Sequence, residues 1–277
     1  MNAPANIKAM RAMAQTGDMP PAAARPLEIA VVVLPGFSHL ALHAYIEPFR
    51  IANAFSQLPL FRWKIGGIDS RAVSGANGLA ISVDVTIDDL IAGNCGDLRL
   101  DLLAIVAGEA VEKQLTPQLN TFLRYVARRG VSISAIGTAT WLLARTGLLA
   151  DKRCTIHWSR LAAFSEVFRK PRIRDTLFVK DGQYSTCAGE LAAFDLAVDL
   201  IGSQAGSFIA QEVCRHATVQ GQRSGSNRQT GPSGLASSVT SLLWRRGAWK
   251  RTLRCPCPWA RWRTSSAFPD GSSNACL

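Results

Sequence analysis

The sequence predicts an α/β three-layer sandwich with a mostly parallel sheet, followed by a basic tail that is not globular. Three strand-sized apolar runs, at residues 27–34, 102–107 and 131–136, are separated by segments with helical patterns. Strands that alternate with helices of this length form a parallel sheet covered on both faces. The charge balance then changes abruptly near residue 215, where the second piece of the chain begins.

The first elements follow from composition and punctuation. Residues 27–34 form an unbroken β-branched apolar run, as expected for a buried parallel strand, and Pro35 and Gly36 end it. A helix kinked at Pro48 follows, because apolar residues recur at helical spacing at Leu42, Tyr45, Ile46 and Phe49. Residues 61–68 and 79–85 are shorter candidate strands, and residues 102–107 form another buried strand.

The second half of this piece has clearer boundaries. Thr116 suits a helix N-cap, Pro117 the first helical position, and Gly130 the left-handed position after the helix. After the strand at 131–136 we expect a helix at 141–146 and strands at 154–157, 176–179 and 184–187. The last helix carries its apolar stripe from Leu191 to Ile201, and we expect Gly202 to stop it.

Composition excludes several classes of protein. No apolar run approaches the roughly 20 residues that a membrane-spanning helix needs. Residues 1–26 lack a continuous apolar core, so we expect a disordered leader rather than a secretory signal. Seven scattered cysteines suit a reducing compartment better than a disulfide framework. We therefore expect a cytoplasmic protein with no membrane contact.

In folds of this class, ligands bind beyond the carboxyl ends of the parallel strands. Three loops occupy that position here, at residues 35–39, 108–112 and 137–140. Backbone N–H groups at the turn beginning with Gly137 would suit a carboxylate or another anion. These loops are where we look for chemistry.

The run AIGTATWLLARTGLLADKRCTIHW, residues 135–158, resembles a stretch of the PfpI-like domains in the class I glutamine-amidotransferase-like superfamily. More closely, it resembles GlxA-type regulators of the AraC family. In those proteins a strand enters a sharp turn with Cys and Thr-Gly, then a helix ending Ala-Gly-Leu-Leu, then a Thr-x-His-Trp strand. Further matching segments lie in the same order at residues 35–37, 46–53, 179–182, 188–189 and 195–196. The resemblance covers residues 27–216 and implies a flavodoxin-like sheet.

Transferred onto this chain, the resemblance places Gly137 where the enzymes of the superfamily carry their catalytic Cys. A glycine offers no thiolate, so no covalent intermediate can form there. The acid that the enzymes set against that Cys falls near Ala41, and only His157 is retained. A base without a nucleophile or an acid partner is not a catalytic unit, so we expect a pseudoenzyme that keeps the site as a ligand pocket. Its candidate lining residues are Gly36, Phe37, Ser38, Gly137, Thr138, Ala139, His157 and Trp158.

Each of these residues also has a plain structural interpretation. His157 is equally well explained as a satisfied structural histidine, and glycine at 137 as a residue that tolerates a strained turn. Thr138 and Thr140 are more typical of helix caps than of ligand contacts. His39 and His43 have the spacing of a metal pair, but without a third ligand we expect no metal site and no cofactor.

The tail departs from the pattern of the regulators, which continue through a linker into a helix-turn-helix domain. Residues 217–236 are rich in polar residues and glycine and predict a flexible linker. Residues 237–277 have no helical period but hold four of the seven tryptophans, and residues 215–277 carry ten basic side chains against one acidic one. Three explanations compete: a basic, aromatic nucleic-acid-binding arm; a metal knuckle of Cys255, Cys257 and Cys276, whose spacing is wrong for zinc; or a shifted reading frame.

The third explanation can be examined by back-translation. We take codons that are permitted for residues 248–277 and join the third base of each codon to the first two bases of the next. One permitted choice then encodes MEANLEVPLPLGALADIVRLSRRQLERLF. This resembles the start of an AraC-type helix-turn-helix domain, with capping-box spacing at its second helix. The hypothesis is a frameshift between about residues 231 and 249, which leaves an aberrant basic tail.

The resemblance therefore implies a transcriptional regulator whose PfpI-like domain forms a homodimer and senses a small, nitrogen-containing effector. DNA is the partner of the intact family member, whereas this chain as written is expected to bind DNA only without sequence specificity. The alternatives are a PfpI-like hydrolase or amidotransferase-type enzyme, disfavoured by Gly137, and a free-standing binding module.

Overall fold

The computed structural model describes residues 25–56, 59–93, 99–108 and 110–229. The chain divides into two units, Met1–Gln229 and Thr230–Leu277, and the second lies outside the described residues, as does most of the expected leader. The strands are β1 (Leu27–Val33), β2 (Phe61–Gly67), β3 (Ala72–Ser74), β4 (Ala80–Ser82), β5 (Val85–Thr86), β6 (Leu102–Ala107), β7 (Ser132–Gly137), β8 (Arg153–Cys154), β9 (Arg172–Ile173), β10 (Phe178–Asp181) and β11 (Tyr184–Cys187). The helices are α2 (His39–Phe55), α3 (Ile87–Ala92), η1 (Val111–Lys113), α4 (Pro117–Arg128), α5 (Thr140–Arg145), α6 (Trp158–Val167), α7 (Ala192–Ala205) and α8 (Ser207–His216).

A seven-stranded sheet with the order β10-β11-β7-β6-β1-β2-β5 forms the centre of the first unit. All neighbouring pairs in it are parallel except β10 with β11. The strands β1, β6 and β7 are those predicted from their apolar runs. The α/β class and the mostly parallel sheet are therefore confirmed.

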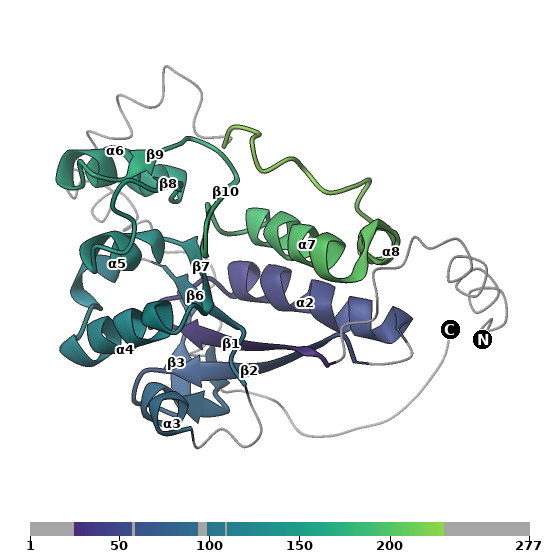
Figure 1. Ribbon diagram of the computed structural model, residues 1–277, viewed down its shortest axis with the longest axis horizontal. Helices are drawn as coiled ribbons and strands as arrows, with labels where there is room; N and C mark the ends of the chain where they lie inside the picture. Colours follow the sequence, from purple (N-terminus) through teal and green to yellow (C-terminus); the bar gives the residue numbers. More distant parts are fainter. Residues whose placement is uncertain (1–24, 57–58, 94–98, 109, 230–277) are drawn as a thin grey trace, which may run out of the picture. The chain divides into compact units, whose positions relative to one another are not determined.

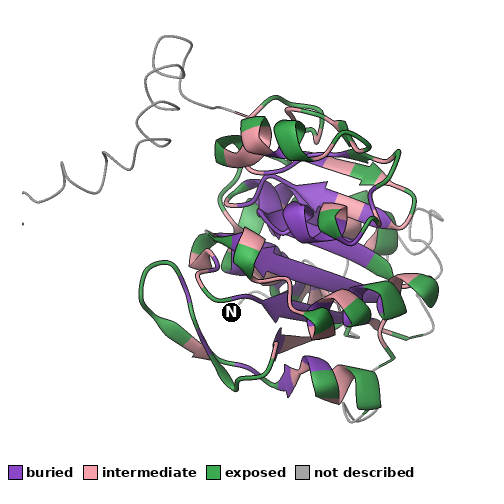
Figure 2. Cartoon of the chain, turned by 90° about the vertical axis from the view of Figure 1, so that its left-hand side faces the viewer, coloured by how far each residue is buried: buried purple, intermediate pink, exposed green. Residues whose placement is uncertain are grey.

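Alternate residues of β1 enter two separate hydrophobic cores, which makes the sandwich three-layered. Ile29, Val31 and Val33 belong to the core shared with α2, α7 and α8. Ala30 and Val32 belong to the core shared with α4 and α5 on the opposite face. Figure 1 shows these helices on the two sides of the sheet, and Figure 2 shows the buried strands between exposed helical faces.

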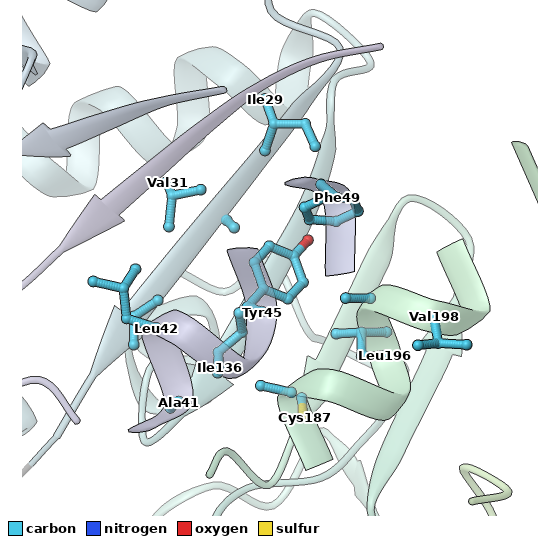
Figure 3. Packing of buried hydrophobic residues seen from close by; sticks show 14 of the residues in the cluster. Ile29, Val31, Ala41, Leu42, Tyr45, Phe49, Ile136, Cys187, Leu196 and Val198 are labelled. Carbon is cyan, nitrogen blue, oxygen red and sulfur yellow. The ribbon is translucent and has the colours of Figure 1, made fainter. Parts of the chain in front are cut away.

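The first core is built around Tyr45 of α2, which is fully buried. Its ring meets that of Phe49 edge-on, with 5.3 Å between the ring centroids. Figure 3 shows Tyr45 between residues of β1 and Leu196 of α7. Residues predicted as the apolar stripe of this helix thus face the sheet, as helical spacing requires.

Several boundaries differ from the predictions. The expected strand at 79–85 is divided, because β4 pairs with β3 in a hairpin and β5 joins the edge of the main sheet. The expected strand at 154–157 ends at Cys154, the strand at 176–179 is shifted to β10, and α7 continues past Gly202 to Ala205. Beyond it, α8 was not predicted, although Ile209 and Val213 bury one face of it against the first core. No helix of the described part of the chain is long and apolar enough to cross a membrane.

Residues 217–229 were expected to belong to a flexible linker, but they lie against the domain. The backbone N–H of Leu177 donates to the carbonyl of Asn227, with 2.9 Å between the atoms. The Arg223 guanidinium pairs with the buried carboxylate of Asp195 at 2.7 Å. The polar composition of this segment predicts that water surrounds it, whereas these tertiary hydrogen bonds attach it to the domain.

Candidate functional site

The parallel strands β1, β6, β7 and β11 end at the same edge of the sheet, so the segments that follow them meet there. Gly36 follows β1, and its N–H donates to the carbonyl of Ser74 in the hairpin at 2.8 Å. Phe37 is fully buried, and its ring lies tilted against the ring of His39, with 4.6 Å between the ring centroids. Phe37 therefore belongs to the base of this edge rather than to an open ligand surface.

Gly137 ends β7 in the left-handed backbone region, with a φ angle of +73°. A Cβ atom at this position would lie 2.7 Å from the carbonyl oxygen of Ala107, closer than real Cβ atoms approach. The turn is thus closed by backbone against backbone. Both its geometry and its space select glycine.

The N–H groups of this turn already have partners. The Thr138 N–H donates to the carbonyl of Ala107 at 3.3 Å, and the Ala139 N–H donates to that of Ile136 at 3.4 Å. The Thr138 hydroxyl donates to the carbonyl of Gly108. The expected cradle of free N–H groups for an anion is therefore not formed by these two residues.

The two threonines of the turn do not act as helix caps. The hydroxyl of Thr140 is fully buried and donates to the carbonyl of Thr155 at 2.8 Å. The N-cap of α5 is Ala139, which makes no side-chain capping bond. Thr138 and Thr140 instead tie the turn to the loops beside it.

His157 caps the N-terminus of α6, which begins at Trp158. Its Nδ1 atom lies 2.8 Å from the Ser159 hydroxyl and accepts from the Ser159 N–H at 3.4 Å. Burial lowers the pKa of His157, and the positive charge of Arg160 lowers it further, whereas Glu190 raises it. The imidazole is thus favoured in its neutral form. The exposed ring of Trp158 lies beside it, with 5.3 Å between the ring centroids.

Glu190 is a site residue that the sequence reasoning missed. Its carboxylate accepts a hydrogen bond from the hydroxyl of Ser38 at 2.7 Å, and it acts electrostatically on His157. Its φ angle is +47°, an unusual backbone conformation for a residue other than glycine. Such a conformation costs about 1–3 kcal/mol, and residues that adopt it cluster at functional sites. The available signal was an acid in the loop that follows β11, which ends at Cys187, at the carboxyl edge of the sheet.

The edge thus carries several polar side chains from different segments. Ser38 follows β1, Glu190 follows β11, and His157 begins α6. The guanidinium of Arg160 in α6 pairs with the carboxylate of Glu112 in η1 at 2.9 Å, which joins two further segments. Acceptors, a neutral imidazole and a paired guanidinium suit the recognition of a small polar molecule.

The histidine pair of α2 has a structural role. The rings of His39 and His43 stack with 5.8 Å between centroids, and His39 Nε2 lies 3.1 Å from the carbonyl of Leu79. Among the residues the structure describes, no group of three or more His, Cys, Asp or Glu side chains could hold a metal ion. Cys154 and Cys187 are both buried.

Comparison with known proteins agrees with this architecture. The chain is 36% identical over 182 residues to the HTH-type transcriptional regulator CdhR of Pseudomonas aeruginosa, covering 66% of this chain and 52% of that protein. It is 27% identical over 191 residues to the HTH-type transcriptional regulator GlxA of Rhizobium meliloti, covering 67% and 55%. This chain spans about half the length of the curated relatives it matches.

Solved structures share the fold. An AraC family transcriptional regulator from Pseudomonas putida superposes with a TM-score of 0.61 at 23% identity, covering 69% of this chain and all of that one. DJ-1beta of Drosophila melanogaster superposes with a TM-score of 0.58 at 22% identity, covering 70% and 98%. The resemblance to GlxA-type regulators is confirmed. Because the sequence model of the DJ-1/PfpI family matches residues 24–203, well over half of the chain, this protein belongs to the DJ-1/PfpI family.

Proposed function

We propose that the domain at residues 27–216 is the sensor of a transcriptional regulator. It binds a small, nitrogen-containing effector at the carboxyl edge of the sheet, forms a homodimer, and thereby biases DNA binding by a helix-turn-helix domain in the intact protein. The observation that carries the proposal is the polar set of Ser38, Glu190 and His157, built around a turn with no nucleophile. The similarity to transcriptional regulators supports it.

We infer that this site does not catalyse. Gly137 has no side chain, and burial raises the pKa of the Cys154 and Cys187 thiols to about 12. A nucleophilic cysteine needs its thiolate at working pH, and these two thiols stay protonated. A site without a nucleophile can still bind, and the remaining polar groups serve recognition.

The acidic side chain of Glu190 supports an effector with an amine or another cationic nitrogen. Hydrogen bonds to a charged group are worth about 1.5–3 kcal/mol each, more than those between neutral groups. His157, held neutral by burial, does not repel a cation. Both observations favour a positively charged nitrogen beside these residues over an anion.

The test is stabilisation of the full chain by a panel of small amines and amino acids. A compound that binds only the folded state stabilises it by about 2.7 kcal/mol at a hundred times its Kd. We expect Glu190→Gln to abolish this stabilisation, and Glu47→Gln, an exposed carboxylate on α2 paired with Arg50, to retain it. Equal stabilisation of both variants would contradict the proposal, as would a panel without any stabilising compound. Sedimentation at two concentrations tests the homodimer.

For residues 237–277 we propose an out-of-frame tail, which lies outside the described residues. Sequencing of the gene from the codon of Gln220 to beyond the stop should find an open frame that encodes helix-turn-helix units after one inserted or deleted base. As written, the chain should bind duplex DNA only weakly, with affinity that falls steeply with salt. A sequence-specific footprint at physiological salt would refute this.

A further inference from the structure

Residues 217–229 return from the end of α8 along the domain toward β10 (Figure 1). The first attachment is at Arg223. Its backbone N–H donates to Asp195 Oδ1 at 2.7 Å, and its guanidinium donates to Oδ2 at 2.9 and 2.7 Å. The Asp195 side chain is only 3% exposed, so Arg223 neutralises a carboxylate that α7 buries.

The second attachment is to the residues at the start of β10. The N–H of Leu177 donates to the carbonyl of Asn227 at 2.9 Å, and that of Phe178 donates to the carbonyl of Gly225 at 3.3 Å. Gly225 lies against the Phe178 ring so closely that a Cβ there would be 2.7 Å from the ring. The segment therefore docks in a defined register.

The third attachment reaches the candidate effector site. Nε2 of Gln229 donates to Ile156 O at 2.9 Å, to Thr155 Oγ1 at 3.0 Å and to Thr176 O at 3.2 Å. Ile156 directly precedes His157, and the carbonyl of Thr155 accepts from Thr140, beside the Gly137 turn. A side chain of the exit segment thus holds the loop that carries the site histidine.

We propose that residues 222–229 form an output strap, in which Gln229 positions the His157 loop, so that attachment of the strap and occupancy of the effector site are thermodynamically linked. The proposal rests on the proposed function for the meaning of the site. Such linkage is reciprocal. If an occupied effector site changes the equilibrium constant for attachment of the strap by some factor, attachment of the strap changes the affinity for the effector by the same factor. The bistable element is the strap, docked or released.

Release of the strap has a geometric consequence for the rest of the chain. Residues 222–229 would pass from the surface of the domain into the tether, and eight extended residues span up to about 26–29 Å. In an intact regulator, this change in reach alters how a following domain can be placed on DNA. A sensor can thus transmit occupancy without moving its core.

The experiment uses the full chain without any effector. Hydrogen exchange is measured at the amides of Leu177 and Phe178, and the His157 pKa is measured by NMR among only four histidines. We expect Gln229→Ala to speed exchange at both amides by about tenfold, as for one lost net hydrogen bond, and to shift the pKa of His157. The control is Gln118→Ala on α4, which removes one exposed hydrogen bond to Asp88 of α3 and should change neither the exchange nor the pKa.

Gly225→Ala provides a second, independent release, because its methyl group pushes against Phe178. It should speed the same two amides and shift the His157 pKa in the same direction. In the reverse direction, Glu190→Gln should change exchange at Leu177 and Phe178. Faster exchange in both strap variants with an unchanged His157 pKa would overturn the proposal. That result would overturn the strap without contradicting effector binding. Conversely, an amine panel without a stabilising compound would contradict the proposed function without contradicting the link between the strap and the His157 loop.

Discussion

Replacing Gly137 with alanine should destabilise the protein more than its backbone conformation alone explains. Two glycines of this chain have the same φ angle but opposite surroundings. Gly137 has φ +73° and the Ala107 carbonyl oxygen 2.7 Å from an added Cβ, whereas Gly130 has φ +72° and nothing within 4 Å. The pair therefore separates the conformational cost from the steric cost.

The magnitudes follow from these two terms. A left-handed alanine costs about 1–2 kcal/mol, and a more restricted unfolded chain returns about 0.4–1 kcal/mol. Gly130→Ala should thus lose about 1 kcal/mol of the free energy of unfolding. At Gly137 a backbone carbonyl must move as well, and overpacking of this kind adds about 1–3 kcal/mol.

The assay is equilibrium unfolding of the two variants and the parent chain in urea, with comparison of midpoints at equal slopes. We expect Gly137→Ala to be the less stable variant by at least about 1 kcal/mol. Equal midpoints would refute the conclusion that the turn closes tightly against β6. The larger loss would also mean that a catalytic Cys cannot be restored here by one substitution without adjustment of β6.

Three further predictions concern the core, the imidazole and the thiols. Phe122→Ala should cost about 3–5 kcal/mol in urea unfolding, because this side chain is fully buried in α4, and exposed Tyr125→Ala on the same helix less than about 1 kcal/mol. The pKa of His157 is lowered in the folded state, so burial of its neutral imidazole is compatible with full stability above pH 6.5 and costs stability as the pH falls through the folded pKa. In His157→Gln the free energy of unfolding should therefore depend less on pH between about pH 5 and 7 than in the parent chain. Cys154 and Cys187 should resist alkylation at about pH 8 and react only in denaturant, and rapid labelling of either by mass spectrometry would revive the enzymatic alternative.

The sequence was sufficient for the parts of the fold that depend on local pattern and burial. β1 could be predicted because both of its faces are buried, which requires an unbroken apolar run. The helix at α4 could be predicted because its cap is local: the Thr116 side chain accepts from the Leu119 N–H at 3.1 Å. By contrast, the β3–β4 hairpin has three-residue strands whose pairing is a tertiary matter, and they leave little periodic signal.

The sequence indicates the edge of the sheet at which several candidate site residues lie, but it does not indicate all of them. Parallel topology places Ser38 and Gly137 at one edge, and the family resemblance adds His157. In the structure the His157 N–H donates to the Gly137 carbonyl at that edge. Glu190 was missed because the acid was sought after the first strand, near Ala41, where the enzymatic relatives carry it. In the structure the carboxylate comes instead from Glu190, after β11. Its place in the site is evident only from the tertiary hydrogen bond that it accepts from Ser38.

The Gly137 turn and the strap at residues 222–229 are connected through Thr155. A nucleophile elbow must leave its side chain free, whereas the Gly137 turn is fastened on several sides: its carbonyl accepts from the His157 N–H at 3.2 Å, and Thr140 bonds to Thr155. The same Thr155 is held by Gln229. If the site does not catalyse, as proposed above, its turn can instead serve as a joint between the proposed effector site and the chain that leaves the domain. A catalytic elbow must be rigid and must leave its side chain open to the substrate. Linkage requires only that the turn be hydrogen-bonded to both the site and the strap.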